Sequence, residues 1–173
     1  PAAIPPPPID SFWNMEEAAW NGTPDEVIDS SGNTNHATAT CIGAVCSVPT
    51  TTANGKLGRG GDFGGDDYFL SSRNVFDPAA TDFTAAIWFK PTNVTTFQAL
   101  VSQQDGVGTG RYWLAMSATG TLTSNIAGTP QTGGTTPLLA NTWYHAALTR
   151  QGGTIALYLN GAQEAQVTGR TVS

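Results

Sequence analysis

Residues 142–161 read TWYHAALTRQGGTIALYLNG and predict two antiparallel strands joined by a tight turn. On both sides of the central Gly-Gly, apolar side chains recur at every second position, which is the period of a strand. Glycine adopts a positive φ at low cost and therefore suits the reversal. Asn160-Gly161 predicts a second hairpin, because a type I′ turn needs positive φ at both central residues. We therefore expect residues 142–168 to form a three-stranded antiparallel meander.

The composition favours a β-rich extracellular domain and excludes several classes of function. The chain has 173 residues, of which 39% are hydrophobic and only 12% are charged, so Thr, Ser, Asn, Gln and Gly provide most of its polarity. Threonine favours strands, whereas glycine and asparagine favour turns. The net charge of −6 and the lack of a basic run argue against binding to nucleic acid. No apolar stretch approaches the roughly 20 residues of a membrane helix, so we expect no membrane insertion.

Further strands are expected upstream of the meander. In FTAAIWFKP (83–91), Phe83, Ala85, Ile87 and Phe89 fall on one face and Trp88 on the other. Because both faces are apolar, this strand is predicted to be central and buried. The regular spacing of strands and turn signals predicts an all-β sandwich. Other strands are expected near residues 11–15, 59–63, 68–70, 97–104, 111–117 and 121–128, and exposed loops at 47–56 and 128–137.

The two cysteines lie five positions apart in CIGAVC, as Cys41 and Cys46. This spacing allows a small disulfide-closed loop, and two free thiols are the alternative. A zinc site would need about four ligands, and the two histidines lie in unrelated contexts. The opening PAAIPPPPI predicts a stiff Pro-rich linker at residues 1–9, with an ordinary disordered N-terminus as the alternative, followed by one domain at residues 10–173.

The order of several motifs resembles the laminin-G-like jelly roll of the concanavalin A-like lectin/glucanase superfamily. The matching pieces are DSSGNTNHATAT, GKLGRGGDFGGDDYF, DFTAAIWFKP, ALVSQQ, YWLAM and LLANTWYHAALTRQGGTIALYLNG, within residues 10–168. The opening EEAAWNGTPDEVIDSSGN resembles copies attached to bacterial pilus-biogenesis and surface proteins. The resemblance implies an all-β fold of two antiparallel sheets packed face to face, a secreted or cell-surface location, and a binding or adhesion module more often than an enzyme.

The C-terminal end departs from the family pattern. Members usually add strands after Tyr-Leu-Asn-Gly that return beside the first strand, whereas this sequence ends at TGRTVS (168–173). We therefore expect a sandwich that lacks its closing C-terminal strand and has an open edge. A partner chain or a second copy would pair with that edge. This gives an alternative function, a structural subunit of a pilus or other surface assembly.

Catalysis is not expected, although some relatives with this fold hydrolyse glucans through clustered carboxylates. Retaining hydrolysis needs two carboxyl groups about 5 Å apart. The nearest match is PDEVIDS, with Asp25, Glu26 and Asp29. Glu26 and Asp29 are three positions apart and would point to opposite faces of a strand. A glycan-cleaving enzyme is therefore the third hypothesis.

Calcium is a candidate cofactor because it binds several oxygen ligands. Asp29, Asn33 and Asn35 alternate on the Gly-containing loop DSSGNTN and form the predicted metal site. A second candidate is the group Asp62, Asp66 and Asp67. The alternative is that these side chains bond to their own backbone in turns.

The leading hypothesis is a non-catalytic extracellular recognition or adhesion module that binds a glycan or a surface protein. Contacts are expected from loops 103–112 and 128–137 at one end of the sandwich. Lectins stack sugar rings on exposed aromatic side chains and bond the hydroxyls with polar groups. The predicted ligand-binding residues near loops are Trp20, Asp105, Arg111 and Tyr112, whereas Trp88, Trp113 and Trp143 are expected to pack within the sandwich.

Overall fold

The structure is a computed structural model and describes residues 8–43, 45–71, 82–103, 112–126 and 132–169. The chain divides into two compact units, Pro1–Val75 and Phe76–Ser173. The described residues form strands and turns and contain no helix. Accordingly, none of them belongs to a helix long and apolar enough to cross a membrane.

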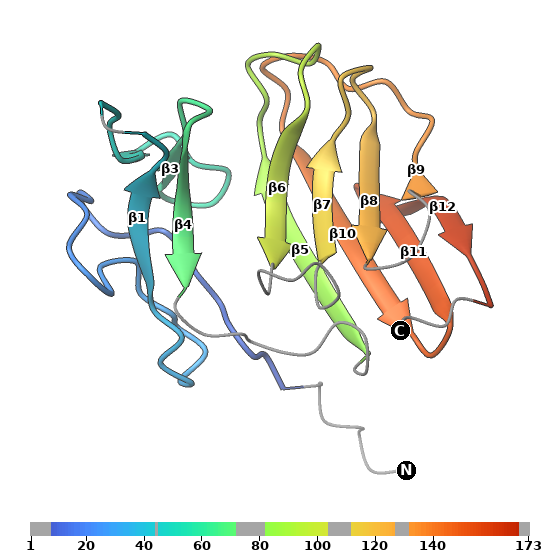
Figure 1. Ribbon diagram of the computed structural model, residues 1–173, viewed down its shortest axis with the longest axis horizontal. Helices are drawn as coiled ribbons and strands as arrows, with labels where there is room; N and C mark the ends of the chain where they lie inside the picture. The colour runs from blue at the N-terminus through green and yellow to red at the C-terminus, as the bar shows by residue number, and fades with distance from the viewer. Residues whose placement is uncertain (1–7, 44, 72–81, 104–111, 127–131, 170–173) are drawn as a thin grey trace. The chain divides into compact units, whose positions relative to one another are not determined.

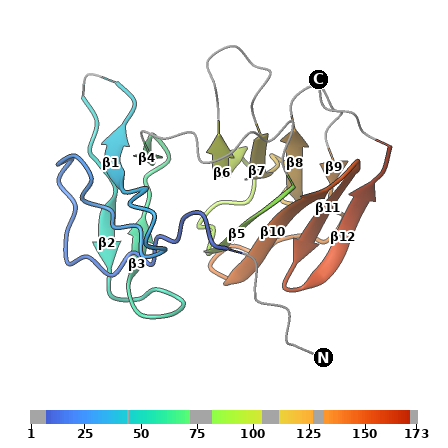
Figure 2. The ribbon, with the colours of Figure 1, turned by 90° about the horizontal axis from the view of Figure 1, so that it is seen from below.

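The second unit is a sandwich of two four-stranded sheets (Figures 1 and 2). All neighbouring strands in both sheets pair antiparallel. The first sheet has the order β12-β11-β10-β5 and consists of β5 (Phe83–Phe89), β10 (Tyr144–Gln151), β11 (Thr154–Leu159) and β12 (Ala162–Val167). The second has the order β6-β7-β8-β9 and consists of β6 (Gln98–Gln103), β7 (Tyr112–Met116), β8 (Leu122–Ile126) and β9 (Thr132–Gly133).

One apolar core lies between these two sheets. Alternate residues of each strand point into it, which is why the period of two in the sequence was informative. Leu114 of β7 and Leu148 and Leu157 of the facing sheet are completely buried within one cluster. The predicted two-sheet antiparallel sandwich is therefore confirmed.

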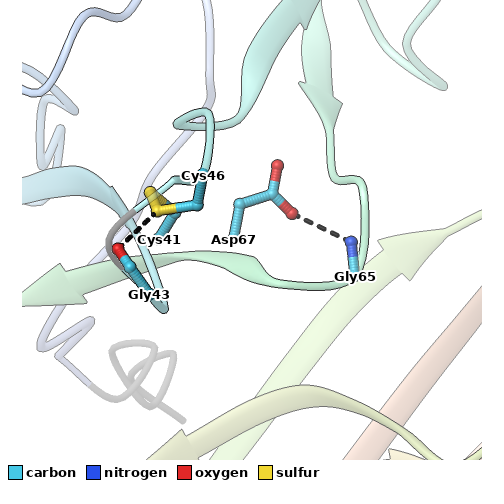
Figure 3. Close-up of a disulfide and its surroundings, with 5 residues drawn as sticks. All are labelled: Cys41, Gly43, Cys46, Gly65 and Asp67. Atoms are coloured by element: carbon cyan, nitrogen blue, oxygen red, sulfur yellow. Dashed lines mark hydrogen bonds between the residues drawn. A yellow bond between two sulfur atoms is a disulfide. The ribbon is translucent and has the colours of Figure 1, made fainter.

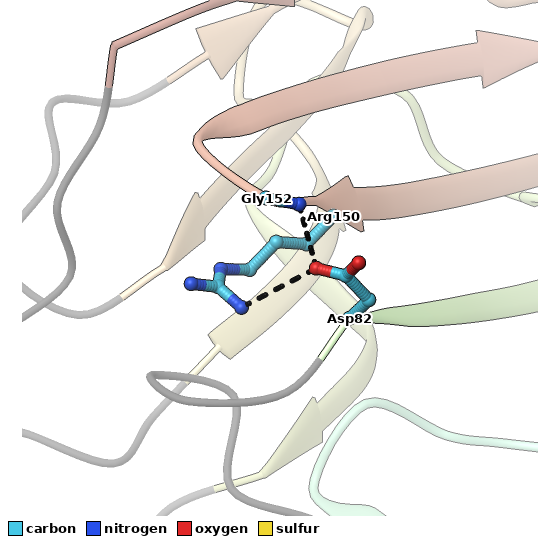
Figure 4. Close-up of polar contacts among 3 residues, drawn as sticks. All are labelled: Asp82, Arg150 and Gly152. Atoms are coloured by element: carbon cyan, nitrogen blue, oxygen red, sulfur yellow. Dashed lines mark hydrogen bonds and ion pairs between the residues drawn. The ribbon is translucent and has the colours of Figure 1, made fainter.

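The three-stranded meander predicted for residues 142–168 is also confirmed as β10, β11 and β12. Asn160 and Gly161 have φ values of 50° and 83°, as a type I′ hairpin turn requires. Gly152 has a φ of 54° in the turn between β10 and β11. The carboxylate of Asp82 accepts a 2.6 Å hydrogen bond from the N–H of Gly152 and lies 3.8 Å from the guanidinium of Arg150 (Figure 4). This contact ties the turn to the residue that precedes β5.

The predictions for β5 and for two loops were wrong. β5 stands at the end of its sheet among the described strands, and its outer face is exposed, so it is not a central buried strand. Within the predicted loop 128–137, residues 132–133 pair with β8 as β9, and Thr132 is buried. Within the predicted loop 47–56, residues 50–52 form a strand. Short polar strands of this kind carry too little apolar alternation to be distinguished from loops.

The first unit contains two two-stranded antiparallel sheets. One pairs β1 (Ala37–Cys41) with β4 (Asp67–Ser71), and the other pairs β2 (Thr50–Thr52) with β3 (Gly60–Asp62). The strand expected at residues 11–15 is reduced to a single bridge between Trp13 and Asp29. A separate core cluster is formed by Trp20, Val27, Ala37 and Ala39.

The predicted disulfide between Cys41 and Cys46 is confirmed, with the Cα atoms 5.9 Å apart (Figure 3). It closes a short loop at the end of β1. In the chain-entropy account, so short a loop stabilises the fold by about 2 kcal/mol at most.

Replacing Leu157 by Ala should lower the free energy of unfolding by about 2–5 kcal/mol, because it leaves a cavity between the two sheets. The matched control Leu139→Ala, at an exposed position of the same unit, should change it by less than about 0.5 kcal/mol. Urea denaturation followed by tryptophan fluorescence measures both. Equal effects of the two substitutions would contradict the shared core.

Candidate functional site

The predicted calcium ligand Asp29 is a buried carboxylate with four hydrogen bonds, and its residue is 4% exposed. One oxygen accepts the backbone N–H groups of Phe12 and Ser31, at 2.8 and 2.9 Å. The other accepts the hydroxyl of Ser31 at 2.8 Å and the N–H of Asn35 at 2.9 Å. The side chain thus holds the N-terminal segment against the loop that precedes β1.

These contacts also set the charge state of Asp29. Burial by itself raises the pKa of the carboxyl, but the hydrogen bonds from Phe12, Ser31 and Asn35 outweigh it and lower the pKa from 3.8 to about 2. The ionised form therefore stabilises the folded unit at neutral pH.

The arrangement does not fit a calcium site at Asp29, Asn33 and Asn35. Both oxygens of Asp29 are already used by N–H and O–H donors. The side-chain nitrogens of Asn33 and Asn35 both donate to the carbonyl oxygen of Asp10, at 3.0 and 2.8 Å. Calcium binding here would require these bonds to be exchanged, so the loop follows the turn-forming alternative.

The second calcium candidate, Asp62, Asp66 and Asp67, is not arranged as a metal site either. Asp62 and Asp66 are exposed, and Asp67 accepts the N–H of Gly65 at 3.0 Å (Figure 3). Across the described residues, no group of three or more His, Cys, Asp or Glu side chains is arranged to hold a metal ion.

The carboxylates considered for catalysis also bind backbone groups. Glu26 accepts the N–H groups of Asn21 and Gly22, both at 2.7 Å. The neighbouring Glu17 accepts the N–H of Ile28 at 3.0 Å and the indole N–H of Trp20 at 3.2 Å. These acidic side chains stabilise a segment that has few ladder hydrogen bonds of its own.

Of the four predicted ligand-binding residues, the two that the structure describes are buried. Trp20 and Tyr112 are each only 6% exposed and belong to the two different core clusters. Neither ring offers a face to a ligand in this conformation, so the expectation that they project from loops was wrong. Burial also raises the pKa of Tyr112 to about 12. Asp105 and Arg111 lie outside the described residues, as does most of the predicted contact loop 103–112 and part of 128–137.

An exposed aromatic group that sequence reasoning missed lies on the outer face of β5, β10 and β11. Trp88 was expected to pack inside, yet it is 42% exposed. Phe89 and other alternate residues of β5 fill the core, so Trp88 must point outward. Its ring meets that of His145 edge to face, with centroids 5.1 Å apart. The alternation in FTAAIWFKP already separated Trp88 from the core residues.

The pairing register extends this group across three strands. Trp88 is opposite His145 in the β5–β10 pair, and the N–H of His145 donates to the side-chain oxygen of Asn160 at 2.9 Å. Two residues further along the chain from Trp88, Lys90 lies over the ring of Trp143, with its Nζ 5.4 Å from the ring centroid. We call Trp88, His145 and Asn160 the β5–β10 row.

None of the outward positions that the structure describes on β5, β10 and β11 carries an acidic side chain. The side chains that alternate with the core residues on β5, β10 and β11 are apolar, amide, hydroxyl or imidazole groups, although the whole chain has 13 Asp and Glu residues. They are Thr84, Ala86, Trp88, His145, Ala147, Thr149, Gln151, Thr154, Ala156 and Tyr158.

The sequence matches a known family over residues 63–173, and that family is described as the Concanavalin A-like lectin/glucanases superfamily. The chain belongs to this superfamily. The resemblance noted in the sequence is therefore confirmed. A search of curated proteins found no match.

Solved structures share the fold at low sequence identity. Domain 4 of an extracellular arabinanase from Geobacillus stearothermophilus, in complex with arabinotriose, matches with a TM-score of 0.57 and 19% identity over 89% of this chain and 78% of that one. An S-layer domain-containing protein from Clostridium thermocellum matches with a TM-score of 0.56 and 21% identity, over 91% and 71%. The CBM40 of a Ruminococcus gnavus sialidase, bound to alpha2,3 sialyllactose, matches with a TM-score of 0.47 and 17% identity, over 56% of this chain and 57% of that one.

Asp29→Asn should destabilise the first unit by about 2 kcal/mol at pH 7, because the depressed pKa stabilises the folded state by that order. Since the folded pKa lies below the unfolded one, this contribution is complete above about pH 4 and is lost as the pH falls towards 2. Urea denaturation between pH 7 and pH 2 should show that the difference in free energy of unfolding between wild type and variant becomes small at low pH. The exposed control Asp66→Asn should show no such difference, and a difference independent of pH would contradict the assignment.

Proposed function

We propose that the second unit is a non-catalytic carbohydrate-binding module, which binds glycan on the outer face of β5, β10 and β11. The observation that carries the proposal is the exposed ring of Trp88, positioned by its edge-to-face contact with His145. Recognition then takes place on a sheet face, in place of the end loops expected from the sequence.

The chemistry of this face suits sugars. An aromatic ring offers a flat apolar surface for the C–H groups of a pyranose or furanose ring, and few of its degrees of freedom are lost on binding. Asn160 supplies an amide group beside these rings, and Thr84 and Thr149 supply hydroxyls four residues further along β5 and β10. A small number of polar groups around an apolar platform is the usual composition of a ligand site.

The relatives support the same class of ligand. The arabinanase domain with a similar fold was solved with arabinotriose. A fold by itself does not imply a function, so the proposal depends on the β5–β10 row. The arabinanase domain suggests arabinotriose as the first ligand to test.

A non-catalytic role agrees with the use of the acidic side chains. Glu17, Glu26 and Asp29 accept backbone N–H groups within the first unit, and Glu164 of β12 accepts those of Thr135 and Thr136, both at 3.0 Å. The hydrogen bond from the Thr136 hydroxyl lowers the pKa of Glu164. Burial opposes this shift, and the bonds from the two N–H groups add to it. A general acid needs a raised pKa instead.

We also propose that the protein is extracellular or displayed on a cell surface. The disulfide between Cys41 and Cys46 supports this location, because such bonds persist in oxidising compartments.

Trp88→Ala should weaken glycan binding at least about tenfold, since losing a stacking ring removes roughly 1.4 kcal/mol or more. The wild type is screened on a glycan array that includes arabinotriose, and its best hit is titrated calorimetrically against both proteins. Tyr68→Ala, at an exposed aromatic position of the first unit, is the matched control and should bind as wild type does. A wild type that binds no glycan, or a Trp88→Ala variant with unchanged affinity and unchanged stoichiometry, would overturn the proposal.

Assembly through an open sheet edge, the alternative drawn from the sequence, stays a prediction. Light scattering distinguishes it from the proposed function. A monomer that binds glycan supports the module, whereas ordered multimers that dissociate only on denaturation would support assembly.

A further inference from the structure

We propose that the second unit has a second glycan-binding surface, formed by Phe97, Ser102 and Trp113 on the outer face of β6 and β7. The inference rests on the proposed function, since it takes the unit to be a carbohydrate-binding module. It adds a site on the other sheet and thereby makes the module bivalent.

Trp113 points away from the core. Its neighbours in β7, Tyr112 and Leu114, both belong to the buried cluster between the sheets, so the alternation of the strand places the indole on the outer face. The ring of Phe97 meets the indole edge to face, with centroids 5.4 Å apart and an interplanar angle of 86°. Phe97 is 53% exposed, so this aromatic pair reaches the surface.

Polar groups flank the indole on both neighbouring strands. Ser102 of β6 is directly opposite Trp113 and is exposed. Asn125 of β8 is opposite Trp113 on its other side. The row from Ser102 through Trp113 to Asn125 therefore places a hydroxyl, an aromatic ring and an amide side by side across three strands. The β5–β10 row likewise combines an indole, in Trp88, with an amide, in Asn160, but has the imidazole of His145 in place of a hydroxyl.

The face favours an uncharged glycan over a protein or an ionic ligand. Apart from the aromatic pair, the outward positions of β6, β7 and β8 carry small or polar uncharged residues. Ala99 and Ser102 are exposed and Asn125 is half-buried, whereas Ala115 and Thr123 are buried, so the accessible part of the face lies along β6. A protein partner would need a core of several large apolar side chains. Among the described residues of this face there is one aromatic pair, which is enough for a sugar ring but small for a protein interface.

The two surfaces act on different glycan segments. The sheets pack through their inner faces, so their outer faces point in opposite directions. No short segment contacts both, but a polysaccharide or two neighbouring chains can. Bivalent binding raises the apparent affinity for a polymer without raising that for a short oligosaccharide.

The test is affinity electrophoresis of the full chain in native gels containing arabinan, xylan or laminarin, with light scattering of the same mixtures. Wild type should be retarded in at least one gel and should cross-link that polysaccharide into particles. Trp88→Ala and Trp113→Ala should each lower the apparent affinity about tenfold and abolish cross-linking, and the double variant should migrate as in an empty gel.

Two further variants separate binding from folding. Trp113→Phe keeps an aromatic ring and should retain most of the retardation, whereas Phe12→Ala, an exposed aromatic position in the first unit, should behave as wild type does. If Trp113→Ala is retarded in the gel and cross-links the polysaccharide as wild type does, while Trp88→Ala does neither, the inference of a second surface is wrong and the proposed function stands. If wild type is retarded in none of the gels, both are overturned.

Discussion

The shared core of the second unit is the constraint on which its other features depend. Each strand buries every second side chain between the two sheets, and the residues between them must then face solvent. Trp88 and Trp113 are outward because Phe89 and Leu114 are inward. An aromatic residue on such a face is held on a rigid scaffold at low entropic cost, which is the condition for binding a weakly interacting ligand such as a sugar.

The first unit is stabilised in a different way. Its N-terminal segment makes only isolated bridges, so its backbone N–H groups need other acceptors. Asp29, Glu17 and Glu26 supply them, and Arg59 donates to the carbonyl oxygens of Glu17 and Ala18 at 3.0 and 3.1 Å. Acidic residues that look like metal ligands or catalytic groups in the sequence therefore accept backbone N–H groups in the folded unit.

The candidate site shows where sequence reasoning succeeds and where it stops. Periodicity separated Trp88 from the core residues of β5, but the apolar character of both faces suggested that the strand was covered on both sides. Trp20 lies near turn signals in the sequence and was a candidate for ligand binding, with a structural role as the alternative. It packs against Phe69 from a distant strand, with ring centroids 4.6 Å apart. Contacts between residues so far apart have no local signature.

The sequence by itself determined the strand class and the meander with its Asn160-Gly161 turn, because these depend on local φ preferences and alternation. Its cysteine spacing allowed the disulfide, and the order of its motifs carried the resemblance to the family. Only the tertiary structure decided which tryptophans are buried and which carboxylates accept hydrogen bonds from backbone N–H groups. It also decided that Trp88 and His145 lie side by side. The physical reason is that burial and cross-strand contact depend on sheet order and register, which join residues distant in sequence.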